Sequence, residues 1–342
     1  MISRKEAIPK LITIETNEEI IPGFSISPFL ADAREAKKET IFCFRFLVTS
    51  KFYIDSHDIV GVFDKFMLLK DDSIYYSNQI FPKIKLNLIF KPYKDEIQVN
   101  PMYLGLTKEK IGSVYPPGVL LLDCTFVKLL THNYLILHSG GVSDDDGAYL
   151  FIAPPNTSKT TTVLQFLNNH KNLLYVGEDT VIVDVSRNCV YSTPHTSTFF
   201  HHDNLFEHIK GLFHVNRKST ARHLFGERVL ETSRSISTIF LLQKGSDNKV
   251  IPLEDVDFDE VIEILLSIQR YEFSWFKNPL LRATSFLLDS WHNIDELLKK
   301  EELLRKLLNQ NQVFLVRSSN SLQFYRLIRE IVGYQNTIPR VT

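Results

Sequence analysis

Residues 148–167 read AYLFIAPPNTSKTTTVLQFL, and this stretch decides how the chain is interpreted. The apolar run at 148–152 predicts a buried strand, and the residues from about 159 to 168 predict a helix. Pro154 and Pro155 mark a loop between them. The sequence therefore predicts a strand, a loop and then a helix that opens with Lys159.

The spacing within this loop matches the phosphate-binding pattern G-x-x-x-x-G-K-[ST]. Lys159 and Thr160 stand where the pattern has its lysine and hydroxyl, while Ala153 and Ser158 replace its two glycines. A lysine ammonium neutralises phosphate charge, a hydroxyl ligates Mg²⁺, and a helix N-terminus offers unpaired N–H groups. The alternative is an ordinary N-cap followed by helix residues. The residues expected to bind a nucleotide are Ala153, Pro154, Pro155, Asn156, Thr157, Ser158, Lys159, Thr160 and Thr161.

The absence of both glycines bears on how tightly the loop binds a nucleotide. Glycine serves such a loop by adopting positive φ and by letting the chain approach the phosphate closely. If φ at Ser158 is positive, its side chain costs about 1–3 kcal/mol of strain. We expect this strain to weaken nucleotide binding without abolishing it.

Two adjacent carboxylates, Glu178 and Asp179, follow an apolar run in LLYVGEDTVIV at 173–183. One carboxylate of such a pair can hold Mg²⁺ while the other accepts the proton of a substrate hydroxyl. The alternative is a polar turn between two hairpin strands. With the phosphate loop upstream, we expect Thr160, Glu178 and Asp179 to hold the metal ion. Which acid is the base stays open.

The order of these motifs resembles the HPr kinase/phosphorylase and phosphoenolpyruvate carboxykinase-like ATPase group. LHSGGV at 137–142 comes first, followed by an acidic turn at 143–147, the loop and the acid pair. The resemblance covers about residues 116–255, together with the last strand and helix near 313–332. It implies ATP or another nucleoside triphosphate as co-substrate, Mg²⁺ as cofactor, and kinase activity toward a hydroxyl.

The resemblance also implies roles for single residues. Lys159 would contact the β- and γ-phosphates and Thr160 the metal, while His138 would lie near the phosphates as a hydrogen-bond donor. His138 has an alternative reading, a histidine satisfied by the backbone at a strand end. Glu178 departs from the group's usual Asp-Asp pair by one methylene. The expected catalytic residues are Lys159, Glu178, Asp179 and His138.

Two further clusters carry weaker hypotheses. A zinc site is one interpretation of the first cluster, although lining of a substrate pocket is preferred because no cysteine pair accompanies it. One member of the second cluster could stabilise a transferring phosphoryl group, although each is otherwise a surface charge. The first cluster is His195, His201, His202 and Asp203. The second is Arg217, Lys218, Arg222 and Arg228.

The remaining patterns predict a mixed α/β (α+β) protein with two domains. Alternating aromatic and polar residues predict a largely antiparallel, β-rich domain over 1–110. For residues 111–342 the resemblance implies an HPr-kinase-like nucleotide-binding domain with a mixed sheet and a helical C-terminal part. The expected strands are 40–50, 51–56, 73–81, 86–93, 97–106, 134–137, 148–152, 173–176, 180–185, 236–243 and 313–318. The expected helices are 119–130, 159–168, 259–271, 294–310 and 321–332.

The composition limits which partners and which cellular compartment we expect. Lys and Arg number 39 against 40 Asp and Glu, so no global positive field favours nucleic acid or an anionic membrane. No stretch approaches the roughly 20 apolar residues of a spanning helix, and no secretory signal is evident, which predicts a cytoplasmic protein. The three cysteines, Cys43, Cys124 and Cys189, suit a reducing compartment and are interpreted as buried apolar residues.

Three functions are compatible with these patterns. The first is an ATP-dependent kinase acting on a hydroxyl of a peptide, a protein or a small molecule, with a homo-oligomer possible. The second is a non-catalytic nucleotide-binding sensor or scaffold with a degenerate loop. The third is an α/β interaction protein without a nucleotide site.

Overall fold

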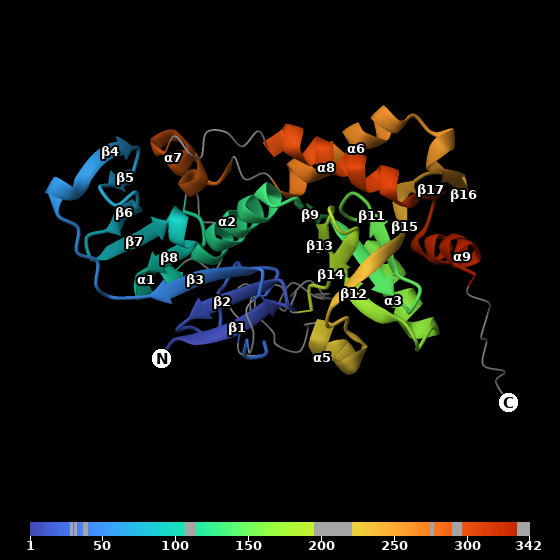
Figure 1. Ribbon diagram of the computed structural model, residues 1–342, viewed down its shortest axis with the longest axis horizontal. Coiled ribbons are helices and arrows are strands. Elements are labelled where there is room, and N and C mark those ends of the chain that lie inside the picture. Colours follow the sequence, from blue (N-terminus) through green and yellow to red (C-terminus); the bar gives the residue numbers. More distant parts are fainter. Residues whose placement is uncertain are drawn as a thin grey trace. The chain divides into compact units, whose positions relative to one another are not determined.

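The computed structural model describes residues 1–27, 30, 33–36, 40–106, 114–194, 221–273, 277–288 and 296–333. These residues form two compact units, each built on a sheet with parallel and antiparallel pairs (Figure 1). The mixed α/β fold expected from the sequence is confirmed. The first unit takes in the described parts of Met1–Thr131, His195–Leu224 and Phe273–Asp295. The second takes in those of His132–Pro194, Phe225–Glu272 and Glu296–Thr342.

The first unit contains an eight-stranded sheet. Its strands are β1 (Ser3–Ile8), β2 (Ile12–Thr16), β3 (Phe42–Val48), β4 (Ile59–Phe63), β5 (Phe66–Leu69), β6 (Ile74–Phe81), β7 (Ile84–Lys91) and β8 (Glu96–Val99). They lie in the order β1-β2-β3-β8-β7-β6-β5-β4. Strand β3 pairs parallel with β2 and β8, and every other neighbouring pair is antiparallel, so antiparallel pairing dominates as expected.

Three helices accompany this sheet: α1 (Pro101–Leu106), α2 (Pro117–Thr131) and α7 (Pro279–Leu287). Side chains of α2 and of the strands, Leu121 and Phe44 among them, line a cavity of about 270 Å³. The apolar face of the helix therefore covers part of this face of the sheet. Asn278 caps the N-terminus of helix α7, because its Oδ1 accepts hydrogen bonds from the N–H groups of Leu280 and Leu281.

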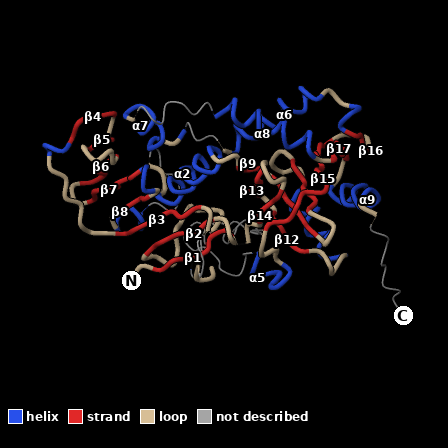
Figure 2. The backbone as a smooth tube through the Cα atoms, in the orientation of Figure 1, coloured by secondary structure: helices blue, strands red, loops and turns tan. Residues whose placement is uncertain are grey.

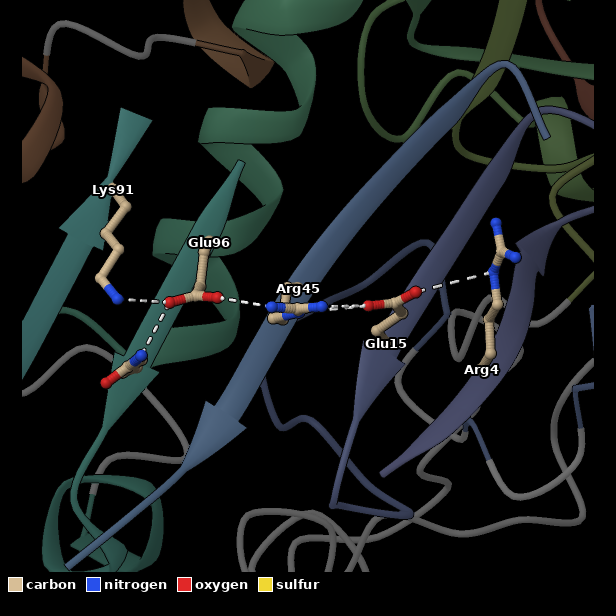
Figure 3. A network of polar contacts seen from close by, with 6 residues as sticks. Arg4, Glu15, Arg45, Lys91 and Glu96 are labelled. Atoms are coloured by element: carbon tan, nitrogen blue, oxygen red, sulfur yellow. Dashed lines mark hydrogen bonds and ion pairs between the residues drawn. The ribbon is translucent and has the colours of Figure 1, made fainter. Parts of the chain in front are cut away.

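A row of alternating charges crosses the strands of the first sheet (Figure 3). Arg45 lies 2.9 Å from Glu15 and 3.2 Å from Glu96, and Arg4 and Lys91 extend the row at its two ends. Burial opposes ionisation of Glu96, but hydrogen bonds from Lys91, Gln98 and Arg45 outweigh it and hold its pKa below the ordinary value. The row thus pairs charges on neighbouring strands.

The second unit contains a nine-stranded sheet. Its strands are β9 (Tyr134–Leu137), β10 (Ser139–Ser143), β11 (Ala148–Ile152), β12 (Leu174–Gly177), β13 (Val181–Asp184), β14 (Cys189–Tyr191), β15 (Ser233–Lys244), β16 (Lys249–Pro252) and β17 (Gln312–Ser318). The main path runs β12-β10-β11-β15-β14-β13-β9, and β17 joins β15 to β16. The long strand β15 pairs with β14 near its start and parallel with β11 and β17 further on.

The helices of the second unit pack in pairs. They are α3 (Lys159–Asn169), α6 (Phe258–Glu272), α8 (Glu296–Gln310) and α9 (Ser321–Ile331), and the short α5 (Ala221–Phe225) precedes β15. Helix α6 lies beside α8 (Figure 2), while α3 contacts α9 and β10. A Cβ atom at Gly140 of β10 would lie 2.7 Å from Val163 of α3. This glycine therefore lets α3 approach the sheet closely.

Two of the expected strands are wrong in whole or in part. No strand forms at 51–56, because Asp55 accepts a hydrogen bond from the N–H of His57 and caps a short 3-10 turn. The expected strand at 97–106 ends at Val99, because Asn100 accepts from the N–H of Tyr103 and Pro101 begins α1. The other expected strands and all five expected helices form, with ends shifted by a few residues.

Cysteine exposure departs from expectation at one position. Cys124 and Cys189 are buried as predicted, whereas Cys43 is exposed. In the described parts of the chain, no helix is long and apolar enough to cross a membrane.

Candidate nucleotide and phosphoryl-transfer site

Three segments of the second unit converge because β10 runs antiparallel to both of its neighbours. Ser139, at the start of β10, faces Ile152 at the end of β11, and Gly141 faces Gly177 at the end of β12. His138 directly precedes β10, the loop follows β11, and the acid pair follows β12. The sheet order therefore brings together three motifs that are distant in sequence.

The loop joins β11 to the first residue of α3, as the sequence predicts. Ser158, the N-cap residue, has φ +73° and ψ +23°, and Asn156 has φ +60°. Glycine adopts such positive φ values at no steric cost, whereas other residues are strained there. Ser158 thus has the backbone conformation for which the phosphate-binding pattern uses glycine. Its side chain makes no capping hydrogen bond.

Hydrogen-bonding groups of the loop are left open. Among the described residues, none accepts a hydrogen bond from the backbone N–H groups of residues 156–161. The hydroxyls of Thr160 and Thr161 likewise make no hydrogen bond within this part of the structure. The first N–H groups of a helix carry partial positive charge and form a ready site for an anion. This loop therefore has the donors that a phosphate group requires.

Lys159 is the first residue of α3 and is buried, with 5% of its surface exposed. Its Nζ donates to the carbonyl oxygens of Ala153 at 3.4 Å and Pro154 at 3.5 Å. Burial lowers its pKa to about 8, although the negative charges of Asp179, Glu272 and Glu178 oppose that change. The ammonium thus lies over its own loop, within electrostatic reach of three carboxylates.

The two adjacent acids differ in environment. Glu178 is 1% exposed, whereas the side chain of Asp179 is 43% exposed. Asp179 Oδ1 lies 3.2 Å from His138 Nε2. Asp179 is therefore the acid that an incoming molecule can reach, and Glu178 acts on Lys159 from the interior.

His138 lies between two carboxylates. Its Nε2 faces Asp179, and its Nδ1 lies 3.3 Å from Glu272 Oε1. Burial lowers the pKa of the imidazole, the ammonium of Lys159 adds to this and Asp179 opposes both, with a net pKa of about 4. His138 is thus a neutral ring at pH 7, and the structure brings it together with Lys159 and Asp179.

Glu272 is a member of this cluster that the sequence analysis missed. It is the last residue of α6 and raises the pKa of Lys159. Burial raises the pKa of Glu272, the charge of Asp179 adds to this, and Lys159 opposes it. A carboxylate at a helix C-terminus is unfavourable toward the helix dipole by about 0.3–1 kcal/mol. An acid at the C-terminal end of the predicted helix was the signal in the sequence that could have pointed to Glu272.

The residues of the two weaker clusters are not found at this site in the described part of the chain. The guanidinium of Arg228 donates to the carbonyls of Leu167, His170 and Leu173, so it caps the C-terminal end of α3 instead of facing the loop. His195, His201, His202, Asp203, Arg217 and Lys218 lie outside the described residues, as does the side chain of Arg222.

No ready-made metal centre is found in the described residues, since no three His, Cys, Asp or Glu side chains gather to hold an ion. Mg²⁺ at nucleotide sites usually keeps several waters and takes only one or two carboxylates in addition to phosphate oxygens. Thr160, Glu178 and Asp179 can provide ligands of that kind. The expected metal residues thus fit an ion that arrives with a nucleotide.

Comparison with protein-family models gives no match to this chain, and comparison with curated proteins gives none either.

Proposed function

We propose that this chain is a kinase that binds a Mg²⁺-nucleoside triphosphate at Ala153–Thr160 and transfers its γ-phosphoryl group to a hydroxyl. The observation that carries the proposal is the position of Lys159. It is buried at the first turn of a helix, beside open loop amides, and its pKa responds to Asp179, Glu272 and Glu178. As part of the same proposal, the second unit is an HPr-kinase-like nucleotide-binding domain.

The loop would bind the phosphates. The open N–H groups of residues 156–161 and the helix dipole attract oxygen anions. Lys159 would exchange the carbonyls of Ala153 and Pro154 for phosphate oxygens, which are stronger acceptors because they are charged. Bound Mg²⁺ supplies positive charge that stabilises the transferring phosphoryl group. Thr160 and Glu178 would hold that ion, which leaves Asp179 free of the metal.

Asp179 would act as the base, because it is the exposed acid of the pair. As the oxygen of the acceptor hydroxyl forms its bond to the γ-phosphorus, its O–H bond breaks and the proton passes to the Asp179 carboxylate. The bond from the γ-phosphorus to the bridging oxygen breaks with its electron pair, and the nucleoside diphosphate leaves. Lys159 neutralises charge on the oxygens throughout. The acceptor is a hydroxyl of a peptide, a protein or a small molecule.

A non-catalytic nucleotide sensor or scaffold is the second candidate, and Ser158 favours it. Its φ of +73° strains a residue that has a side chain. Strain of about 1–3 kcal/mol weakens binding by roughly one to two orders of magnitude if the strained conformation has to be adopted on binding. A sensor needs affinity but no turnover, so the two candidates differ in a measurable way.

Thermal unfolding with Mg-ATP, Mg-GTP and Mg-ADP tests nucleotide binding. A ligand at 100 times its Kd stabilises the folded protein by about 2.7 kcal/mol. Lys159→Met keeps the aliphatic stem but removes the charge, so it should abolish the shift. Lys171→Met, at an exposed position just after α3, is the matched control and should retain it. No shift with any nucleotide in the wild-type protein would refute the proposal.

Turnover requires a second measurement. Radiolabelled ATP incubated with the protein and an extract of its native host should label an acceptor, and Asp179→Asn should prevent the labelling. Binding without any labelled product would favour the sensor.

A further inference from the structure

We propose that the cavity in the first unit binds a free α-amino acid with an aromatic side chain. The ring of the ligand would fill the apolar cavity, and its ammonium and carboxylate would pair with Asp95 and Lys128 at the rim. The residues that line the cavity belong to the first unit. The inference therefore goes beyond the proposed kinase activity and does not depend on it.

The interior of the cavity is large and apolar. Protein interiors are close-packed and leave few voids larger than a water molecule. This cavity measures about 270 Å³. An apolar cavity of about 150 Å³ is already large enough to bind benzene. The buried side chains of its walls come from three strands and α2: Phe44, Phe90, Ile97, Leu121, Cys124 and Val127.

Aromatic rings are well represented among the lining residues. Phe44 of β3 and Phe90 of β7 contribute rings from the sheet, and Tyr93 contributes one from the 3-10 turn Pro92–Lys94. Aromatic pairs stabilise each other beyond the burial of their apolar area. The walls therefore suit an aromatic ring better than an aliphatic chain.

The charged groups lie at the rim of the cavity. Asp95 follows the 3-10 turn, and Lys128 lies in the last turn of α2. Their side chains are 26% and 38% exposed, whereas the apolar walls are buried. Lys128 Nζ lies 3.2 Å from Asp95 Oδ2. The rim thus presents one negative and one positive charge side by side.

The backbone fixes the position of Asp95. The residue lies in the left-handed region, with φ +48° and ψ +42°, which aspartate adopts more readily than most residues. Its N–H donates to the carbonyl oxygen of Pro92, and its carbonyl oxygen accepts from the N–H of Arg45. The carboxylate therefore reaches the rim from an anchored turn.

The paired charges select the head group of the ligand. A ligand with a carboxylate alone would bring it near Asp95 as well as Lys128, and a ligand with an ammonium alone would meet Lys128 as well as Asp95. In each case a like-charge contact opposes the attraction. An α-amino acid carries both charges on one carbon atom. It can lie beside the ion pair with each of its charges facing the opposite one.

Calorimetric titration of the full chain with L-phenylalanine tests the inference. The matched probes are 3-phenylpropionate and 2-phenylethylamine, which keep the ring and one charge, and glycine, which keeps both charges without the ring. Phenylalanine should bind about tenfold or more tightly than either single-charge probe, as for one hydrogen bond to a charged group. Glycine should not bind detectably, because it has no apolar part to bury.

Three results with the wild-type protein would overturn the inference. They are the absence of phenylalanine binding up to its limit of solubility, binding of either single-charge probe as tightly as phenylalanine, and binding of glycine as tightly as phenylalanine. Equal binding of the single-charge probes would describe an apolar cavity without selection of the head group.

Variants locate the binding. Val127→Phe adds a ring to the wall and fills the space, so it should abolish binding of phenylalanine. Lys128→Met and Asp95→Asn each remove one charge and should weaken binding about tenfold. Lys70→Met is the matched control, because Lys70 forms an exposed ion pair with Asp58 elsewhere in the same unit. It should bind phenylalanine as the wild-type protein does.

Selectivity distinguishes a direct role of the charges from a general loss of structure. Lys128→Met no longer repels an ammonium, so it should lose the preference for phenylalanine over 2-phenylethylamine. Asp95→Asn should likewise lose the preference over 3-phenylpropionate. Unchanged affinity in Val127→Phe would place the binding elsewhere and overturn the inference. If thermal unfolding shows that Val127→Phe does not fold, the selectivities of the two charge variants decide, and unchanged selectivities overturn it.

Discussion

The Nζ atom of Lys159 lies 3.4 Å from the carbonyl oxygen of Ala153, so the ammonium closes the loop onto its own first residue. Burial lowers the pKa of this ammonium to about 8, so about half of the lysines are neutral at pH 8. Phosphate oxygens favour the charged form and raise the pKa. Binding of a nucleotide at pH 8 should therefore take up about half a proton.

Calorimetry in buffers of different ionisation enthalpy measures this uptake. Affinity should also fall as the pH rises through 8, because the neutral lysine must first be protonated. Lys159→Met should show no uptake from this source. A binding enthalpy that does not vary with the buffer at pH 8 would contradict the assignment of Lys159 to the phosphates.

Ser158→Gly should stabilise the second unit. At φ +73° the substitution removes strain of about 1–3 kcal/mol, and it adds back roughly 0.5–1 kcal/mol through the greater freedom of glycine when unfolded. We expect a net gain of about 1 kcal/mol in the free energy of unfolding, with nucleotide affinity equal or tighter. Urea unfolding and calorimetric titration measure the two quantities.

Asp72→Gly is the control for that change. Asp72 also has positive φ, +59°, but it lies in the turn between β5 and β6 of the first unit. Asp72→Gly should change the free energy of unfolding and leave the nucleotide affinity unchanged. Strong weakening of nucleotide binding by Ser158→Gly would instead make the serine hydroxyl a phosphate ligand.

Much of the second unit could be predicted from local patterns. The strand, loop and helix at 148–169 follow from an apolar run, two prolines and a helical apolar face, and all of these are local signals. The adjacent acids Glu178 and Asp179 follow an apolar strand, as the sequence indicated. Lys159 is placed at the helix start by spacing alone. These features need no information about distant segments.

What could not be predicted depends on contacts between distant segments. Strand β10 reads SGGVS, which has neither an alternating pattern nor branched residues in its first half. Gly140 is explained by α3 packing on it, and Gly141 by the close approach of Leu150 and Val176 from the neighbouring strands. Glu272 ends an amphipathic helix, and its contact with His138 arises from the packing of α6. In the first unit, the helix at 101–106 has a local cause, Asn100 before Pro101, which the strand-like composition of the segment obscured.

His138 should make the folded state sensitive to acid. Burial lowers its pKa to about 4, below the value of about 6.5 for an unfolded chain. Between these values the unfolded state binds more protons, so the free energy of unfolding falls as the pH falls from about 6.5 to 4. The decrease from this group should reach about 3 kcal/mol at pH 4.

Comparison of the wild-type protein with His138→Gln isolates that contribution. The variant cannot take up the proton, so the difference in unfolding free energy between the two proteins should change with pH only in this window. Denaturant titrations at pH 4, 5, 6 and 7 measure it. A constant difference would mean that the histidine is not buried as a neutral ring.

Asp179→Asn should separate catalysis from binding. The substitution keeps the size of the side chain but removes the negative charge needed to accept a proton, so turnover should fall about 10²-fold or more. Nucleotide affinity should persist, because Lys159 and the loop amides remain.

Glu178→Gln removes a buried charge that acts on Lys159, so it should lower the pKa of Lys159 and weaken nucleotide binding above pH 7. These different outcomes follow from the exposure of the two acids, 43% for the Asp179 side chain and 1% for Glu178. Initial rates with an identified acceptor and calorimetric titrations provide the two measurements. If both variants keep near-normal turnover, the acid pair is only a turn between strands, and the nucleotide sensor is then the better description of this protein.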